Sequence, residues 1–447
     1  MQSQHYFGLV LLSLNVSIGG LALYQHVNDE PESRAKKQAP ITVQELKSLS
    51  PECCHSVFHT AVLKGDVEQV INCLKAGSAD DRAHKDGSLL ELAAVEGHAD
   101  ICRVLIAAGA NLQRVSGTFL YKLALQGKQD VLSVLQKAGV SCFCPEGYGR
   151  GRHVLSHAAM EKAHEGINVL LAAGFKPDVQ PEHEELASAI LSGDEEKVRS
   201  LLTPQNASLL DGYDESYLMQ ALYLGYTGIA CAMIQAGADT EVYCHRVGFS
   251  PMYYAASHGY KDVVKALLTA GAGPHSSLLG GNTALGEAIA NGHDDIAYML
   301  LEAGADFESP GGDHGLTPLM YAIGEGNRRM FDKLLAMGAD VNGAAYDGFN
   351  ALMIAARDNS LDMARVLVEK GADVNIMAET FCYTPILIAV MNDSVDCVRY
   401  LIECGANVHG TDYDGNPLLK ISENETIRQL LLDAGAQWEY PGREEEE

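Results

Sequence analysis

The chain has 447 residues, of which 47% are apolar, and its 32 Lys and Arg against 59 Asp and Glu give a formal net charge of -27. The apolar content is sufficient for a folded core and excludes a chain that is disordered throughout. The acidic balance repels nucleic-acid phosphate, so it argues against a DNA- or RNA-binding protein and favours a protein partner that is basic or neutral.

An uncharged run of 18 residues, 7–24, lies near the N-terminus. At about 1.5 Å per residue, it approaches the roughly 30 Å thickness of a bilayer core, and a signal peptide also contains an apolar stretch of this kind. No Lys or Arg precedes the run, whereas Arg34, Lys36 and Lys37 follow it. This bias favours an anchor with the rest of the chain in the cytoplasm.

Residues 1–24 are therefore predicted to be a signal peptide or a membrane anchor, and membrane contact is expected only through 7–24. The chain would then be membrane-anchored or exported. The alternative is a cytoplasmic protein in which the run is a buried helix. Residues 25–51, whose acidic and basic side chains balance, are predicted to be a linker.

From residue 52 onward, Gly repeatedly follows an apolar helical stretch. These glycines lie 30 to 35 residues apart, except for one interval of 63 that spans two units: Gly77, Gly109, Gly139, Gly174, Gly237, Gly271, Gly304, Gly338, Gly371, Gly405 and Gly435. Such self-similarity indicates a repeat array in which each unit buries its apolar face only against its neighbours. The array is predicted to span 52–438 in about twelve units, followed by an acidic tail at 439–447.

Each unit has the same internal order. It starts with a hydroxyl residue that can cap a first helix and often a Pro that suits its first turn, as in Ser250-Pro251, Thr317-Pro318 and Thr384-Pro385. Small residues such as Ala255-Ala256 follow, and a Gly ends this helix. A second helix then carries apolar residues three and four positions apart, so each unit is predicted to be a helix-turn-helix.

These residues resemble the ankyrin repeat, and the best matches are 315–342, 347–375 and 383–409. The resemblance implies an all-α helix-turn-helix solenoid with β-turn fingers. Two departures stand out: Lys162 replaces the Gly of a first helix, and the terminal Gly is missing within 193–215, where irregular packing is expected. The single Trp, Trp438, is predicted to cap the last helix pair.

The sequence contains no phosphate loop, no His-Glu-x-x-His and no Gly-x-Ser-x-Gly, so no enzyme activity and no cofactor are predicted. One cluster has the composition of a zinc site: Cys142, Cys144, His153 and His157. It could bind a metal ion, form an oxidisable cysteine pair, or consist of ordinary loop residues. The glycine-rich stretch 147–152 beside it is interpreted as part of a finger.

Large side chains recur in the fingers. The residues immediately before the helix starts are Phe249, Leu316, Phe349 and Tyr383, and others close by are Tyr346, Phe381 and Tyr413. They could be anchors of an interface or could pack finger on finger. The leading hypothesis is a non-enzymatic scaffold that binds a protein partner on its concave face and finger row. The alternative is an ankyrin-docked regulator in which the Cys and His cluster acts as a metal or thiol site.

Overall fold

The computed structural model describes residues 44, 51–76, 88–144, 152–242, 248–275, 281–312, 314–378 and 382–438. Segment 1–24, nearly all of the predicted linker and the tail 439–447 lie outside these residues. Among the helices that are described, none is long and apolar enough to cross a membrane.

Helices follow one another in pairs along the described chain. The earlier pairs are α2 (Pro51–Lys64) and α3 (Val67–Lys75), α5 (Ser88–Glu96) and α6 (Ala99–Ala107), α7 (Gly117–Leu125) and α8 (Gln129–Lys137), α9 (Val154–Met160) and α10 (His164–Ala172), α11 (Glu184–Ser192) and α12 (Glu195–Leu201), and α13 (Tyr217–Tyr223) and α14 (Thr227–Gln235). Two short 3-10 helices, η1 (Leu112–Arg114) and η2 (Pro181–His183), lie between them.

The later pairs are α15 (Pro251–Ser257) and α16 (Lys261–Thr269), α17 (Ala284–Ala290) and α18 (Asp294–Glu302), α19 (Pro318–Gly324) and α20 (Arg328–Met337), α21 (Ala351–Arg357) and α22 (Leu361–Glu369), α23 (Pro385–Met391) and α24 (Val395–Glu403), and α25 (Leu418–Ile421) and α26 (Glu425–Asp433). The named strands of the described chain are β1 (Phe143–Cys144) and β2 (Arg152–His153), which pair antiparallel. The predicted all-α solenoid is confirmed.

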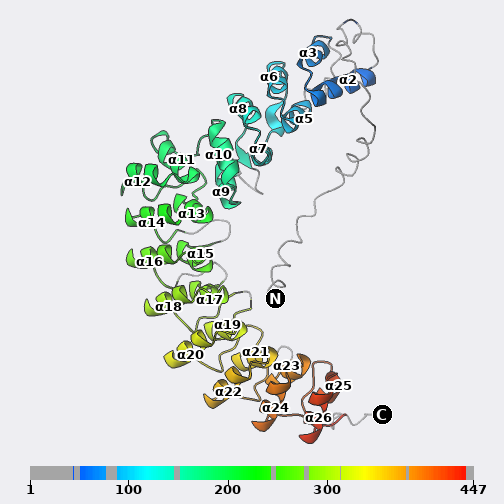
Figure 1. Cartoon of the computed structure of the whole chain (residues 1–447), viewed down its shortest axis with the longest axis vertical. Coiled ribbons are helices and arrows are strands. Elements are labelled where there is room, and N and C mark those ends of the chain that lie inside the picture. Colours follow the sequence, from blue (N-terminus) through cyan, green and yellow to red (C-terminus); the bar gives the residue numbers. More distant parts are fainter. Residues whose placement is uncertain are drawn as a thin grey trace.

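Figure 1 shows the pairs stacked along a curved array, with the first helices on the concave side and the second helices on the convex side from α13 to α24. The predicted helix starts are confirmed. Thr317 Oγ1 accepts a hydrogen bond from Met320 N at 3.4 Å, and Pro318 occupies the first turn. Ala255 and Ala256 are fully buried, which allows neighbouring first helices to approach closely.

Several units place a residue other than Gly at the end of the first helix. Lys162, Asn359 and Asp393 all adopt the left-handed conformation there, with φ of 57°, 50° and 55°. The backbone geometry of the turn is therefore kept where the Gly is lost, at a cost in strain that Gly would not incur.

The stacking is irregular around α11 and α12. The first helix α9 packs directly against α13, while α11 packs against α10, α12 and α13. The second helix α12 ends early, because Leu202 is already extended with ψ of 132°. The fifth helix pair is thus displaced from the row of first helices, in the stretch where the sequence departs from the repeat pattern.

Trp438, the residue predicted to cap the last helix pair, follows α26 at the end of the described residues. Trp438 is 54% exposed, whereas at the same position of earlier units Val341 and Val408 are buried and Val374 is half-buried. Because a terminal cap keeps its outer face in solvent, this exposure leaves the capping role of Trp438 as a prediction.

Candidate interaction surface

The fingers are short turns closed by backbone pairing. An isolated antiparallel bridge joins Ala344 to Asn350 in one finger and Thr411 to Pro417 in another. An aspartate braces each turn: Asp347 Oδ1 accepts from Phe349 N at 3.1 Å, and Asp412 Oδ1 accepts from Asn416 N at 2.8 Å. Each finger is therefore held in one conformation before any partner arrives.

Neighbouring fingers are also tied to one another near their bases. Asn342 Oδ1 accepts from Asp373 N at 2.9 Å, and Asn375 Oδ1 accepts from Asn407 N at 2.7 Å. The same two asparagines donate from Nδ2 to the backbone carbonyls of Gly371 and Gly405. The finger row of these units is consequently one continuous surface.

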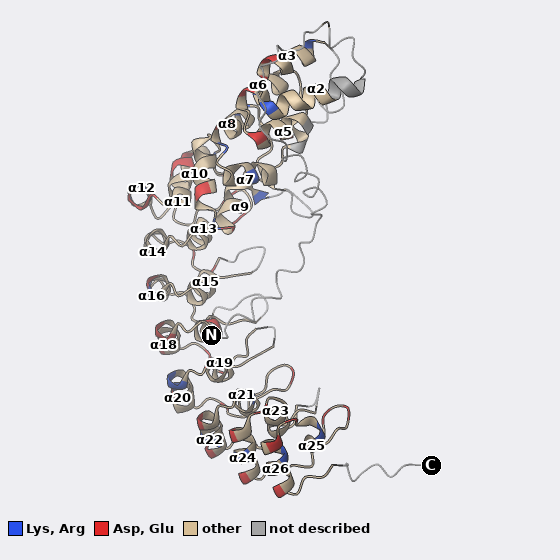
Figure 2. Ribbon diagram, turned by 45° about the vertical axis from the view of Figure 1, so that its right-hand side comes forward, with Lys and Arg blue, Asp and Glu red and all other residues tan. Residues whose placement is uncertain are grey.

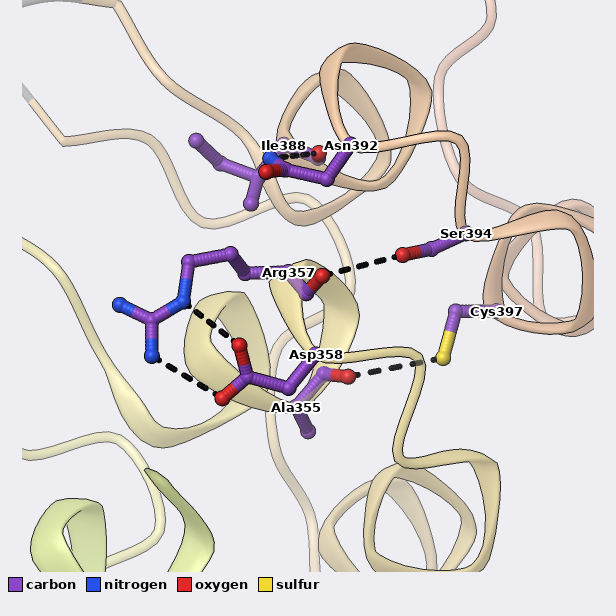
Figure 3. A network of polar contacts seen from close by, with 7 residues as sticks. All are labelled: Ala355, Arg357, Asp358, Ile388, Asn392, Ser394 and Cys397. Atoms are coloured by element: carbon purple, nitrogen blue, oxygen red, sulfur yellow. Dashed lines mark hydrogen bonds and ion pairs between the residues drawn. The ribbon is translucent and has the colours of Figure 1, made fainter. Parts of the chain in front are cut away.

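A further set of contacts joins the first helix α21 to the turn before α24 (Figure 3). Arg357 forms a two-pronged ion pair with Asp358, at 2.8 and 2.9 Å. The carbonyl of Arg357 accepts from Ser394 Oγ at 3.1 Å, and that of Ala355 accepts from Cys397 Sγ at 3.6 Å. Carbonyls at the end of one helix are thus satisfied by the next unit, which fixes the angle between the two.

The large side chains that immediately precede the first helices are half-buried. Phe249 stacks on Tyr253 with ring centroids 5.2 Å apart, and Phe349 meets Tyr383 edge-on at 5.6 Å. Leu316 likewise packs against the core. At these positions, the finger residues contribute to packing within the array.

Two other predicted residues are presented to solvent. Tyr346 is 64% exposed and Tyr413 is 75% exposed. Tyr346 borders a hollow of about 720 Å³ whose lining also includes His275, Asp306 and Phe307. Phe381 lies outside the described residues.

Acidic side chains are not restricted to the fingers. Figure 2 shows them at the ends of the second helices α22, α24 and α26, among them Asp362, Glu369 and Glu403. A partner would therefore meet negative charge on both faces of this part of the array.

The four residues predicted as a possible metal site do not converge. The pairing of β1 with β2 places Phe143 opposite His153 and Cys144 opposite Arg152. Because successive residues of a strand point to opposite faces, Cys144 and His153 lie on different sides of the pair. Within the described chain, no three His, Cys, Asp or Glu side chains are grouped to hold a metal ion.

Three members of that cluster, His153, His157 and Cys142, have local contacts instead. His153 Nδ1 accepts from Leu155 N at 3.3 Å at the start of α9, and its ring contacts Phe143. His157 contacts the Tyr121 ring edge-on, and Cys142 Sγ donates to Val140 O at 3.6 Å. Burial raises the pKa of the Cys142 thiol, with a further contribution from Asp178, which disfavours the thiolate that a metal would need.

A buried polar network next to α9 was not predicted. Asp211 is 5% exposed and accepts four hydrogen bonds, from Ser156 Oγ at 2.5 Å, Gln220 Nε2 at 3.0 Å, Tyr213 N at 2.9 Å and Glu215 N at 2.9 Å. It joins α9, α13 and the finger between α12 and α13. The Asp-Gly pair of that finger recurs at 347–348, where the aspartate is not buried, so the sequence gives no signal that Asp211 is buried.

Arg152, at the end of the glycine-rich stretch interpreted as part of a finger, is fully buried. Its guanidinium carbon lies 5.8 Å from the centre of the Tyr213 ring. Residue 152 is therefore not part of a projecting finger, which corrects the sequence interpretation. The antiparallel pairing of β2 with β1 places Arg152 opposite Cys144 and so brings it back onto the array.

Further along the array, the turn after α9 contacts the turn after α15. Lys162 Nζ lies 3.4 Å from His258 Nε2 and 5.8 Å from the centre of the Tyr254 ring. The pKa of His258 is lowered, first by burial and then by the Lys162 ammonium group. A neutral His258 can accept a hydrogen bond from the Lys162 ammonium group at Nε2 and donate one from Nδ1 to Tyr254 O at 3.1 Å.

Comparisons with known proteins identify the class. A model of three ankyrin repeats matches residues 186–277, 218–310 and 285–378, and a single-repeat model matches 382–413. Together they cover half of the chain, which therefore belongs to the ankyrin-repeat family. The matched residues begin within α11, so helices α2 to α10 precede them.

The curated relatives include the potassium channel AKT2/3 of Arabidopsis thaliana, 28% identical over 41% of this chain and 22% of the relative. The mouse B-cell lymphoma 3 protein homolog is 32% identical over 32% of each chain. The Caenorhabditis elegans ankyrin repeat and KH domain-containing protein mask-1 is 27% identical over 63% of this chain and 11% of its own length. The chain thus spans less than half of the length of each of these relatives.

Among solved structures, the human ASB11 ankyrin repeat domain is 24% identical with a TM-score of 0.42, over 49% of this chain and 98% of that domain.

Proposed function

We propose that the chain is a non-enzymatic scaffold that binds a protein partner on its concave face and finger row. The observation that supports this most directly is the exposure of Tyr346 and Tyr413 on fingers that are braced internally and belong to a tied row. Rigid exposed aromatic side chains are typical interface anchors, because little conformational freedom is lost when they bind.

The proposal includes one array of about twelve repeats. Its support is that helix pairs follow one another from α2–α3 to α25–α26, and that first helices contact first helices on both sides of the irregular fifth pair. A long array gives many fingers to one partner, so weak contacts can add up.

A photo-crosslinking residue tests the binding face. Placed at Met377, which is 54% exposed near the base of a finger, it should give a discrete adduct with a protein partner from the source cells. The same residue at Leu432, 41% exposed on the second helix α26, is the matched control and should give none. Equal adducts from both positions, or none from Met377, would contradict the proposal.

We also propose that residues 7–24 direct the chain to a membrane. Mass spectrometry of the chain from its native source distinguishes the possibilities. A chain that begins at Met1 and sediments with membranes is anchored, and one that begins near residue 25 is exported through a signal peptide. A soluble chain that begins at Met1 would overturn this proposal and leave the cytoplasmic alternative.

A further inference from the structure

Two fingers carry the same three residues at their tips. Tyr346-Asp347-Gly348 precedes α21, and Tyr413-Asp414-Gly415 precedes α25. The two glycines have φ of 84° and 79°, and a backbone bridge closes each turn around them. The same turn therefore places a Tyr and the following Asp at the same two positions in fingers that are two units apart.

Tyr346 is held as a flat platform. Its N–H donates to His314 O at 3.0 Å, and its ring lies so close to Gly315 that a Cβ on that glycine would come within 2.6 Å of ring atoms. One face of the ring thus rests on the preceding finger, while the side chain remains 64% exposed. A ring immobilised in this way loses little entropy when it binds a ligand.

Within the described residues, the carboxylates beside these rings form no ion pair. In the described part of the chain, no ion pair involves Asp347, Asp412 or Asp414. The four finger segments 305–316, 339–350, 372–383 and 406–417 contain nine Asp or Glu and no Lys or Arg. The array thus offers exposed aromatic rings among negative charges that its own side chains do not neutralise.

We propose that Tyr346 and Tyr413 are two subsites for the Lys or Arg side chains of one extended basic segment of the partner protein, and this rests on the proposed function above. Each ring would take a cation over its exposed face, and the neighbouring Asp347 or Asp414 would accept its N–H groups. Arg suits these subsites better than Lys, because its planar guanidinium can stack on a ring and still reach a carboxylate.

The distance between the subsites sets the spacing of the cations. The first helices α21, α23 and α25 are stacked in succession, so the two fingers are separated by two helix spacings of about 8–10 Å each. An extended chain advances about 3.3 Å per residue and needs five or six residues to cover roughly 16–20 Å. The preferred segment therefore has two basic residues about five or six positions apart.

Fluorescence anisotropy with a labelled peptide tests the proposal on the full chain. The probe is a Gly/Ser peptide with two Arg about six positions apart, compared with a peptide that has the two Arg adjacent and with one that has Glu in place of Arg. The wild-type chain should bind the spaced peptide several-fold more tightly than the adjacent one and should not detectably bind the Glu peptide.

Variants separate the contribution of the two tyrosine rings to peptide binding from that of the two carboxylates. Tyr346→Ala with Tyr413→Ala should weaken binding of the spaced peptide about tenfold, whereas Phe at both positions should keep it within about twofold. Asp347→Asn with Asp414→Asn retains the turn acceptor of Asp347 and removes two charges, and it should weaken binding about fivefold at low salt. Asp362→Asn with Glu369→Gln on α22 removes two exposed charges elsewhere and should change binding less than twofold.

The proposal is overturned if spacing has no effect, or if the α22 control weakens binding as much as the finger variant does. It is also overturned if replacing Arg34, Lys36 and Lys37 by Ala strengthens peptide binding, because the chain's own basic segment would then be the occupant. A crosslink from Met377 without any preference for the spaced peptide would leave the scaffold function standing and remove only this inference.

Discussion

The regular stretch from α15 to α26 and the irregular stretch from α9 to α14 hold their units together by different means. In the regular stretch, buried alanines set the distance between helices, and hydrogen bonds from Asn342 and Asn375 tie finger to finger. In the irregular stretch, α9 meets α13 out of order, and the buried Asp211 network joins them. Where the repeat pattern is lost, a buried polar network joins the neighbouring helices that repeated packing and finger-to-finger hydrogen bonds join elsewhere.

Removing the Asp211 carboxylate should give the largest effect. Asp211→Ala removes the acceptor of the buried Ser156 hydroxyl and Glu215 N–H and of the part-buried Tyr213 N–H, and it leaves the Gln220 amide only its longer bond to Ser156 Oγ, so it should cost about 3–5 kcal/mol of unfolding free energy. Asp347→Ala, which removes one partly exposed turn acceptor from the regular stretch, should cost about 1 kcal/mol.

Urea unfolding of both variants measures the difference, with hydrogen exchange to locate it. The loss from Asp211→Ala should appear in α9 and α13 before it appears in α21 or α23, because repeat units open locally. Similar small losses from both variants would show that the network does not hold the irregular stretch together.

Unfolding measurements can also separate finger residues that pack within the array from those that are presented to solvent. Phe349→Ala removes a half-buried ring that contacts Tyr383 and the core, and it should cost about 1–3 kcal/mol, less than the 3–5 of a fully buried Phe. Tyr346→Ala should change unfolding by about 0.5 kcal/mol or less, because its ring is largely in solvent. If Tyr346→Ala were the more damaging, Tyr346 would be a packing residue and not a presented anchor.

The sequence was sufficient for the regular stretch, because its contacts repeat. The cap at Thr317 and the burial of the paired alanines follow from one unit and recur in others. The network was not accessible, because Asp211 and Ser156 are 55 residues apart and meet only after α9 packs against α13. The sequence also could not separate Tyr346 from Phe349, because the twist of the turn decides which of two nearby rings reaches solvent.

Acidification should first weaken the part of the array between α9 and α16. The pKa of His153 is lowered by burial, against the opposing influence of Asp178 and Asp211, and the pKa of His258 is lowered by burial and by Lys162. A base whose folded-state pKa lies below its unfolded value near 6.5 stabilises the fold above that pH, and this stability is lost as the pH falls through the folded-state pKa.

Hydrogen exchange at about pH 7.5 and about pH 5.5 tests this, since the change should be concentrated between α9 and α16. His153→Gln with His258→Gln should flatten the dependence. Equal weakening of α21 to α24 would assign it to groups outside these two histidines.

The smallest expected effect comes from replacing positive-φ residues by Gly. It should distinguish a residue that only carries backbone strain from one that also makes side-chain contacts. Asp393 and Lys162 both have positive φ at the end of a first helix. Replacing either by Gly would relieve about 1–2 kcal/mol of backbone strain. It would also make the unfolded chain more flexible, which destabilises the fold by about 0.4–1 kcal/mol. Asp393→Gly should therefore stabilise the regular stretch by about 0.5–1 kcal/mol.

Lys162→Gly gains the same relief of strain but loses the contacts with His258 and the Tyr254 ring, so its net effect on the free energy of unfolding should be close to zero at neutral pH. It should turn stabilising in acid, where a protonated His258 repels the ammonium group, and a constant effect of Lys162→Gly across pH would show that the contact between the turn after α9 and the turn after α15 does not couple to His258.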